Sequence, residues 1–364
     1  MHMVDGSELR FRAAEFPATA AAASAMLEHR DAPSASAPDI WRHVARARRR
    51  GRRAQTASLC LRARRPLRAL LAAASTTRFG ASVTPQSFEL SRHDGADTLA
   101  AGHRELEDGE RLFTLFGADA RPEHLRGRVV LDLGCGYGGR TLYYARECGA
   151  RRVEGVEITQ AVVDRCTALA ARLGCHNAGF RVGIAEELPF ENERFDAVVS
   201  FDVLEHVDDP VRAVEEVRRV LRPGGRAWLV FPTYLGARSS HLDYVTRLPA
   251  LHRVFDPDTI VEVVNEFLRA DPARFGVGPQ PPPQVTVLGR RTLPTLNGLT
   301  YAETGPLMRH AGLHVDKEVL TPIVTPSLPV PGARVIGSAL AAYSRHARLP
   351  ELLIGSIAIL ARRD

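Results

Sequence analysis

The feature that most constrains the fold is a glycine-rich turn between an apolar segment and a helical pattern. Residues 129 to 141 read VVLDLGCGYGGRT, so a buried strand ends near an acid and passes through glycines into the start of a helix. Gly134, Gly136 and Gly139 have no Cβ, which lets the backbone approach a bound ligand closely. The N–H groups at the start of the helix favour a polar ligand, and the segment therefore predicts a nucleotide-cofactor loop.

The three glycines alone leave the cofactor open. They satisfy the G-x-G-x-x-G pattern, so an oxidoreductase with a nicotinamide or flavin dinucleotide is one interpretation. Asp132 argues against it, because a carboxylate there would lie near the phosphates of a dinucleotide, whereas it would attract a cationic amino group. Glu157 ends a second apolar strand 21 residues after Gly136, a spacing from which a carboxylate reaches a ribose diol. These residues favour a cofactor that carries both a ribose and an amino acid.

Apolar runs alternate with helical patterns along the rest of the chain. The runs at 129–133, 152–156, 195–201 and 227–231 lack polar alternation, which is typical of strands covered on both faces. Thr159 and either Asp208 or Asp209 are placed to cap the helices that follow two of these strands. Further helices are predicted at 97–116, 258–269 and 301–310, and extended segments at 313–323 and 354–362. The pattern predicts an α/β protein with a doubly wound, mostly parallel sheet.

Three further motifs follow the glycine loop in order. Residues 183–190 read GIAEELPF, residues 195–210 read FDAVVSFDVLEHVDDP, and residues 216–225 read EVRRVLRPGG. From about residue 105 to residue 233 this series closely resembles the class I S-adenosylmethionine-dependent methyltransferases, specifically the small-molecule branch. The resemblance implies a seven-stranded Rossmann-like sheet and S-adenosylmethionine as the cofactor.

The resemblance also implies which residues bind the cofactor. In that family the loop of Asp132, Gly134, Cys135 and Gly136 holds the methionine end, and Phe201 and Asp202 lie beside it. Matching the family's ribose and adenine contacts are Glu157, Ile158, Ala185 and Glu186. The chain departs from the family at Ile184, where an acidic residue is usual, because isoleucine cannot accept a hydrogen bond from the adenine amino group.

The domain organisation follows from changes in composition. Residues 1–90 are expected to be a basic extension, disordered or loosely packed, and residues 97–233 the cofactor-binding core. Residues 234–299 form a long connection after the fifth strand, and we interpret it as a cap over the acceptor pocket. Residues 300–364 are expected to supply a helix and the last strands of the core.

Methyl transfer to a hydroxyl group requires alignment of the acceptor and a group that removes its proton. His206, directly after the fourth strand, is the first candidate for this base, and His241 in the cap is the second. Tyr244 and His252 are candidates for the pocket wall. We assign no metal site, although Asp202, Glu205 and His206 form a D-x-x-E-H pattern similar to the cluster with which some quinone O-methyltransferases bind a divalent cation. Mg²⁺ or Mn²⁺ would suit those ligands.

Charge is distributed unevenly along the chain. Between Trp41 and Phe88 there are twelve arginines and no acids, so the remainder of a chain with net charge +6 carries about −6. The arginine-rich arm leaves open a protein that binds S-adenosylmethionine or nucleic acid without catalysis. Only Trp41 accompanies these arginines as an aromatic, so there is no stacking platform and a nucleic-acid partner is not expected.

The composition also bears on the cellular setting. The five cysteines show no paired spacing, no apolar run is long enough to span a membrane, and the first 30 residues do not resemble a secretory signal. A cytoplasmic location is therefore expected, and no particular oligomeric state is indicated. The sequence predicts a methyltransferase for a small organic acceptor, with O-methylation slightly favoured. A role in secondary metabolism is the setting that the breadth of this family suggests.

Overall fold

The computed structural model describes residues 61–75, 95–275, 278–322 and 351–364. The chain divides into two compact units, Met1–Ala37 and Pro38–Asp364, and every described residue lies in the second. Residues 1–60 and 76–90 of the expected basic extension, and residues 323–350 of the expected C-terminal part of the core, lie outside the described residues. In the described ranges no helix is both long enough and apolar enough to cross a membrane.

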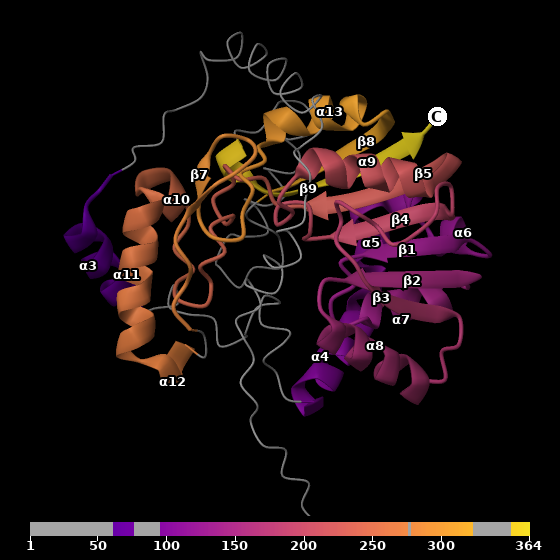
Figure 1. Ribbon diagram of the computed structural model, residues 1–364, viewed down its shortest axis with the longest axis horizontal. Coiled ribbons are helices and arrows are strands. Elements are labelled where there is room, and N and C mark those ends of the chain that lie inside the picture. The colour runs from indigo at the N-terminus through magenta and orange to yellow at the C-terminus, as the bar shows by residue number, and fades with distance from the viewer. Residues whose placement is uncertain (1–60, 76–94, 276–277, 323–350) are drawn as a thin grey trace, which may run out of the picture. The chain divides into compact units, whose positions relative to one another are not determined.

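A seven-stranded sheet lies at the centre of the second unit, in the order β3-β2-β1-β4-β5-β9-β8 (Figure 1). The strands β1 to β5 are parallel, and β9 is antiparallel to both β5 and β8. Their bounds are β1 Val129–Leu133, β2 Arg152–Glu157, β3 Ala178–Val182, β4 Phe195–Phe201, β5 Leu221–Phe231, β8 Leu313–Pro322 and β9 Ile354–Arg363. The predicted doubly wound, mostly parallel sheet is confirmed. Its strand order reverses between β1 and β4, which puts the ligand-binding crevice at their carboxyl ends.

The helices between the strands are α7 (Gly139–Arg146), α8 (Gln160–Arg172) and α9 (Pro210–Val220), and α13 (Tyr301–His310) precedes β8. Asp209 caps α9, since its Oδ1 accepts hydrogen bonds from the N–H groups of Val211 and Arg212 at 3.0 and 3.3 Å. Thr159 stands at the N-cap position of α8 with an extended backbone, but its side chain makes no capping hydrogen bond. Of the two caps predicted from sequence, only the one on α9 is formed by a side chain.

The two faces of the sheet bury separate apolar clusters. Successive residues of β1 point to opposite faces, with Leu131 and Leu133 in the cluster that includes α9 and α13, and Val130 in the cluster that includes α7 and α8. All five residues of β1 are buried. This double coverage explains why the strands read as continuous apolar runs.

The segment before the first strand is not one continuous helix. It consists of α4 (Gly95–Glu107), a short 3₁₀ turn η2 (Asp108–Glu110) and α5 (Arg111–Phe116), and it is followed by η3 (Gly117–Asp119) and α6 (Pro122–Leu125). At Gly109, in the turn, an added Cβ would lie 2.1 Å from Cγ of Tyr143. The expected helix over 97–116 is thus interrupted where the chain packs directly against a tyrosine ring of α7.

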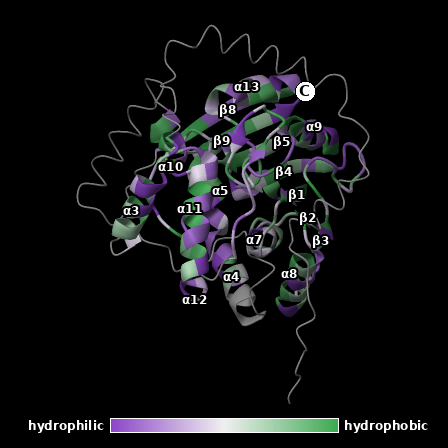
Figure 2. Cartoon of the chain, turned by 60° about the vertical axis from the view of Figure 1, so that its left-hand side comes forward, coloured by the Kyte–Doolittle hydropathy of each residue, from purple (hydrophilic) through white to green (hydrophobic). Residues whose placement is uncertain are grey.

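Residues 234–299 form a separate layer with its own apolar cluster. Its elements are α10 (Leu251–Val254), α11 (Pro257–Ala270), α12 (Pro272–Phe275) and the two-stranded sheet of β6 (Gln284–Val285) and β7 (Arg291–Thr292). Hydrophobic and hydrophilic residues alternate along α11 (Figure 2), and Ile260 and Val264 are among those buried in the cluster. The predicted helix at 258–269 is confirmed as part of α11.

Helix α3 (Arg64–Ser75) packs on this layer. Leu67 and Leu71, one helical turn apart, are buried in the same cluster, and Arg64 lies 2.5 Å from Glu262 of α11. The extension expected over 1–90 therefore differs from the structure at 61–75, where an amphipathic helix docks on the cap. The i, i+4 spacing of these leucines was the available sequence signal.

Candidate active site

The glycine loop surrounds a buried carboxylate at the end of β1. Asp132 is 1% exposed, and its Oδ2 accepts a hydrogen bond of 2.6 Å from Oγ1 of Thr141. Its Oδ1 has no hydrogen-bond partner among the described residues. Burial raises the pKa of Asp132, while the charge of Arg140 opposes that rise. A buried acceptor without a donor fits the cationic amino group of the predicted cofactor.

The turn of the loop depends on glycine for two different reasons. Gly136 has φ +56°, the left-handed region that a side chain disfavours. At Gly139, an added Cβ would lie 2.1 Å from the carbonyl oxygen of Gly102 in α4. The prediction that Gly139 makes room for a ligand is therefore corrected, because a neighbouring helix occupies that side.

Glu157 lies at the end of β2 and faces the same loop. Its Oε2 accepts from the N–H of Gly136 at 3.2 Å, and its Oε1 accepts from the N–H of Ile158 at 2.8 Å. Burial raises the pKa of Glu157, and these two amides act against that rise. The Ile158 side chain is 61% exposed, which leaves an apolar surface available to a flat ring. Contacts of Glu157 with a ribose and of Ile158 with an adenine stay predictions.

Two residues of this region were not identified from the sequence. Glu105 of α4 accepts hydrogen bonds from the N–H groups of Tyr137 and Gly139 at 3.3 and 3.1 Å. Arg140 is half-buried among Glu105, Asp132 and Asp202, and although desolvation lowers its pKa, the negative charges of these acids outweigh that and raise it. The sequence signal for Arg140 was its position directly after two glycines at the start of a helix. No comparable signal pointed to Glu105 in α4.

Ala185 and Glu186, which the resemblance matches to adenine contacts, are positioned by contacts within the protein. Ala185 is buried, and Oε1 of Glu186 accepts from the N–H groups of Asp208 and Asp209 at 2.7 and 3.2 Å. The Glu186 carboxylate thus anchors the segment to the start of α9, and a contact of Glu186 with adenine stays a prediction. The side chain of Cys135 is also fully buried, beside Cys166 of α8, so Cys135 offers the cofactor only its backbone.

Phe201 ends β4, Asp202 follows it, and both lie near arginines. The guanidinium groups of Arg111 and Arg140 each lie 5.3 Å from the centre of the Phe201 ring. Asp202 has φ +55°, and the side chain, 48% exposed, lies with Oδ2 3.7 Å from an Nη atom of Arg111. Asp202 therefore contributes to a charged rim beside the loop.

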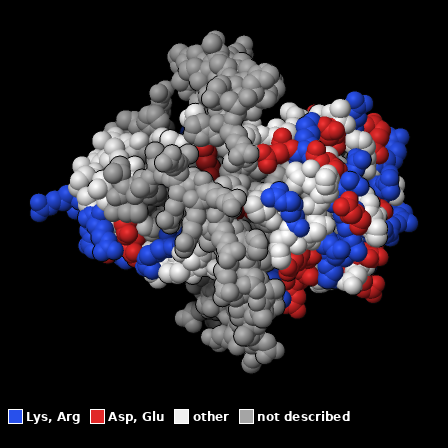
Figure 3. All heavy atoms as spheres, turned by 90° about the horizontal axis from the view of Figure 1, so that it is seen from above, with Lys and Arg blue, Asp and Glu red and all other residues white. Residues whose placement is uncertain are grey.

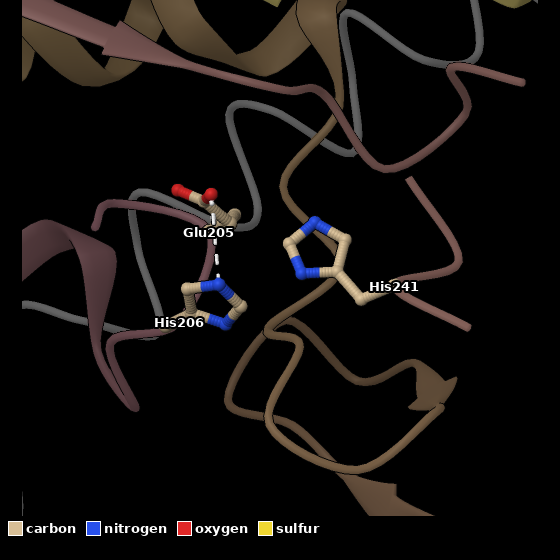
Figure 4. A group of neighbouring side chains, drawn as sticks. All are labelled: Glu205, His206 and His241. Carbon is tan, nitrogen blue, oxygen red and sulfur yellow. Dashed lines mark ion pairs between the residues drawn. The ribbon is translucent and has the colours of Figure 1, made fainter. Parts of the chain in front are cut away.

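Glu205 and His206 of the β4–α9 loop meet His241 of residues 234–299, the segment predicted to cap the acceptor pocket (Figure 4). One ligand atom of each residue lies within 4.8 Å of the others, and the two imidazole rings are 4.8 Å apart at their centres. Both histidines predicted for catalysis are thus brought together across 35 residues of chain. Glu205, which the sequence pointed to only as part of the D-x-x-E-H pattern, lies with them.

The protonation of this group follows from its contacts. Nδ1 of His206 lies 2.8 Å from the carbonyl oxygen of Thr295, and because a carbonyl only accepts, Nδ1 carries the proton and Nε2 has the lone pair. Burial lowers the pKa of His206 to about 3 and that of His241 to about 4, so both rings are neutral. Burial also raises the pKa of Glu205, and the charge of Asp202 adds to that rise.

Asn297 joins the cap to the β4–α9 loop. Its side-chain Nδ2 donates to the carbonyl oxygens of Leu204 and Val207 at 2.7 and 3.0 Å. Its backbone N–H donates to the carbonyl oxygen of Glu205 at 2.9 Å. Asn297 is 2% exposed. This residue was missed by the sequence analysis, since nothing in its neighbourhood distinguishes it from a turn asparagine. Of the predicted wall residues, His252 is buried and its ring centre lies 5.4 Å from that of Tyr234, while Tyr244 packs against the cap cluster.

Known proteins match this chain in the core that carries the cofactor loop. Residues 131–229 match the family model of a methyltransferase domain. The chain is 35% identical over 133 residues to a chloroplastic tocopherol O-methyltransferase of Arabidopsis thaliana, with coverage of 36% of this chain and 38% of that protein. It is 33% identical over 135 residues to an ajmaline N-methyltransferase of Rauvolfia serpentina, with coverage of 36% and 45%. The chain therefore spans less than half the length of these curated relatives.

A solved structure of geranyl diphosphate methyltransferase in complex with S-adenosylmethionine is also similar, with a TM-score of 0.44 and 20% identity over 79% of this chain and 98% of that chain. The family match, the ordered motifs and the strand order point to the same group of proteins. Residues 131–229 therefore form a methyltransferase domain similar to those of the class I S-adenosylmethionine-dependent enzymes, with S-adenosylmethionine as the cofactor.

Proposed function

We propose that this protein transfers the methyl group of S-adenosylmethionine to a small organic acceptor, and that the acceptor atom is oxygen. The observation that carries the proposal is the half-buried pair of neutral imidazoles, His206 and His241, which lie edge to face between core and cap. With the cofactor bound, its sulfonium supplies an electrophilic methyl group. The protein's part is then to orient the acceptor, to exclude water and to accept the acceptor's proton.

The cofactor-binding residues proposed from sequence agree with the geometry around the loop. The orphaned Oδ1 of Asp132 suits the amino group, and Glu157 suits the ribose diol. Gly134 and Gly136 shape the turn, and Phe201 and Asp202 form its far wall. The residues proposed to bind the cofactor all lie among the described residues.

On the acceptor side, Nε2 of His206 is the atom available to take a proton. In the transfer, the acceptor oxygen forms a bond to the methyl carbon, the carbon–sulfur bond breaks with its electron pair going to sulfur, and the hydroxyl proton passes to Nε2. A half-buried imidazole of low pKa is a weak base, so it suits an acidic hydroxyl such as a phenol better than an aliphatic alcohol. The name of one relative, a tocopherol O-methyltransferase, agrees with such an acceptor, whereas ajmaline N-methyltransferase keeps nitrogen as the alternative.

A nucleic-acid acceptor has less support. Figure 3 shows basic and acidic side chains interspersed over the visible described surface, where nucleic-acid binding favours a basic face. In the described part of the arginine-rich arm, Arg64 and Arg68 lie beside Glu262 and Glu266 at 2.5 and 3.7 Å. We also propose a cytoplasmic setting and a role in secondary metabolism. Four described cysteines are free thiols, which agrees with a reducing compartment.

The test is calorimetry followed by an acceptor screen. The full chain is titrated with S-adenosylmethionine, S-adenosylhomocysteine and NADH, and phenols, alcohols and amines are then screened for a methyl mass shift. We expect binding of the first two ligands and methylation of a phenol or other acidic hydroxyl. Binding of NADH instead would overturn the cofactor, and methylation of amines alone would overturn the oxygen acceptor.

A further inference from the structure

The carboxyl group of Glu205 is buried in an unusual way. Glu205 is 5% exposed, and neither carboxylate oxygen accepts a hydrogen bond from another described residue. Its nearest polar contact is Nε2 of His206, 3.6 Å from Oε1 (Figure 4). A buried carboxyl group normally has hydrogen-bond donors or a cation beside it, because burial without them is costly.

The contact between Glu205 and His206 places two lone-pair atoms opposite each other. Since Nδ1 of His206 donates to Thr295, its Nε2 has no proton to give to the carboxylate. The third residue, His241, brings another imidazole to within 4.8 Å of both. Three potential electron-pair donors therefore converge on one point.

We propose that Glu205, His206 and His241 bind one divalent transition-metal ion, with Zn²⁺ or Mn²⁺ the best matches. Two imidazoles with one carboxylate are typical ligands of such ions, whereas Mg²⁺ and Ca²⁺ prefer all-oxygen sites. Metal–ligand bonds of about 2.0–2.2 Å put neighbouring ligand atoms roughly 3.4 Å apart in a tetrahedral site. The 3.6 Å between Oε1 and Nε2 is close to this spacing, and the ligand atoms of all three residues lie within 4.8 Å of one another.

The surroundings of the three residues agree with a metal site. The carbonyl oxygen of Thr295 accepts from Nδ1 of His206, which is the usual way that a protein orients a histidine ligand. The backbone of Glu205 is held by Asn297 at 2.9 Å. The D-x-x-E-H pattern would make Asp202 the third metal ligand, but Asp202 lies beside Arg111. In the structure His241 is the third residue of the group.

The consequence for catalysis rests on the proposed function. With three protein ligands, the ion keeps at least one open position for the acceptor oxygen, and as a Lewis acid it lowers the pKa of that hydroxyl. With the ion bound, Nε2 of His206 would be a metal ligand in place of the proton acceptor described above, and the acidified hydroxyl would release its proton to solvent. Because the ligands come from the β4–α9 loop and from the cap, the ion also links the two.

The test measures metal binding directly on the untagged full chain. After dialysis against EDTA, the protein is titrated calorimetrically with Zn²⁺, Mn²⁺ and Mg²⁺, and its metal content is measured after gel filtration. We expect one Zn²⁺ or Mn²⁺ per chain. Glu205→Gln and His241→Ala should each weaken binding by at least about 100-fold, since even indirect changes near a metal cost about 10–100-fold.

The matched control is the exposed pair of His310 and Glu215, whose Nε2 and Oε1 atoms lie 3.4 Å apart. His310→Ala should leave the stoichiometry and affinity unchanged. Binding of S-adenosylhomocysteine and far-UV circular dichroism verify that each variant is folded, and the smaller change in Glu205→Gln guards against loss of the fold. Equal metal affinity in the wild type, Glu205→Gln and His241→Ala would overturn the site.

The outcomes separate this inference from the proposed function. If EDTA-treated protein binds no ion yet methylates its acceptor, the metal site is wrong and the methyltransferase proposal stands. If one ion binds and depends on His241 while no methylation occurs, the site stands and the proposed function fails.

Discussion

The cofactor side and the acceptor side of the site are built in different ways. Asp132 and Glu157 lie at the ends of adjacent strands and meet through the backbone of one short loop. His206, by contrast, is positioned by Thr295, 89 residues later, and the loop that carries it is held by Asn297, up to 93 residues away. The cofactor side is therefore encoded in a continuous motif, while the acceptor side exists only once the cap lies on the core.

The two sides also balance charge differently. Around the cofactor loop, buried carboxylates have arginines or amides beside them, as Arg140 shows next to Asp132 and Glu105. On the acceptor side, neutral imidazoles surround a carboxyl group that no described arginine or lysine contacts. The first arrangement suits a cofactor with several charges, and the second suits the handling of a single proton or cation.

The sharpest way to separate the two sides is His206→Ala. Loss of the Nε2 atom removes the group that takes the proton or, with an ion bound, holds that ion. We expect kcat to fall by about 10²–10⁴-fold, with the Kd for S-adenosylhomocysteine nearly unchanged. Steady-state kinetics and calorimetry measure these quantities, and His314→Ala on the exposed face of β8 is the control. Normal turnover of His206→Ala would show that the acceptor side lies elsewhere.

The joint between the cap and the core is tested by Glu303→Ala. Glu303 of α13 is 2% exposed and lies 2.6 Å from Arg290 of the cap, and it also accepts from the N–H of Thr300. Removing the Glu303 carboxylate leaves the largely buried guanidinium of Arg290 without its ionic partner, so the free energy of unfolding should fall by about 3–5 kcal/mol. Urea denaturation provides the measurement. A loss near zero would mean that the cap is held without this pair.

Cofactor binding is tested by Glu157→Ala. The carboxylate would hold the ribose diol through charge-assisted hydrogen bonds, so we expect the Kd for S-adenosylhomocysteine to rise by roughly 10–100-fold, or about 1.5–3 kcal/mol. Calorimetry is again the measurement, and Glu147→Gln at the exposed end of α7 serves for comparison. An unchanged Kd in Glu157→Ala would remove this residue from the cofactor site.

The smallest effect on stability is expected at the surface ion pair of Arg291, the residue after Arg290, with Asp258. An Nη atom of Arg291 lies 2.5 Å from Oδ1 of Asp258. Its hydrogen bond to Arg291 lowers the pKa of Asp258. The pair therefore stabilises the fold above the unfolded-state pKa of about 3.9, and this contribution disappears as the pH falls through the lower folded-state value. Asp258→Asn should lower stability at pH 7 far less than Glu303→Ala, and the difference from wild type should vanish in acid. Unfolding curves at neutral and acidic pH compare the two variants.

Much of the fold could be read from the sequence because it depends on local patterns. The strands near 129, 152 and 195, the helix at 301–310 and the cap of α9 by Asp209 follow from apolar periodicity and capping chemistry. The interruption at Gly109 did not, since it depends on a ring from α7. The neighbours Cys135 and Cys166 likewise show no paired spacing in the chain, yet both are buried in one small cluster.

The sequence by itself determined the doubly wound core and its cofactor loop, because strand periodicity, glycine conformation and the positions of Asp132 and Glu157 are properties of short segments. It also named His206 and His241, but each only as a separate candidate. Their meeting with Glu205, and the clamp by Asn297, were decided by the tertiary structure. The physical reason is that residues far apart in the chain come together only through the packing of the cap on the core, which no local pattern records.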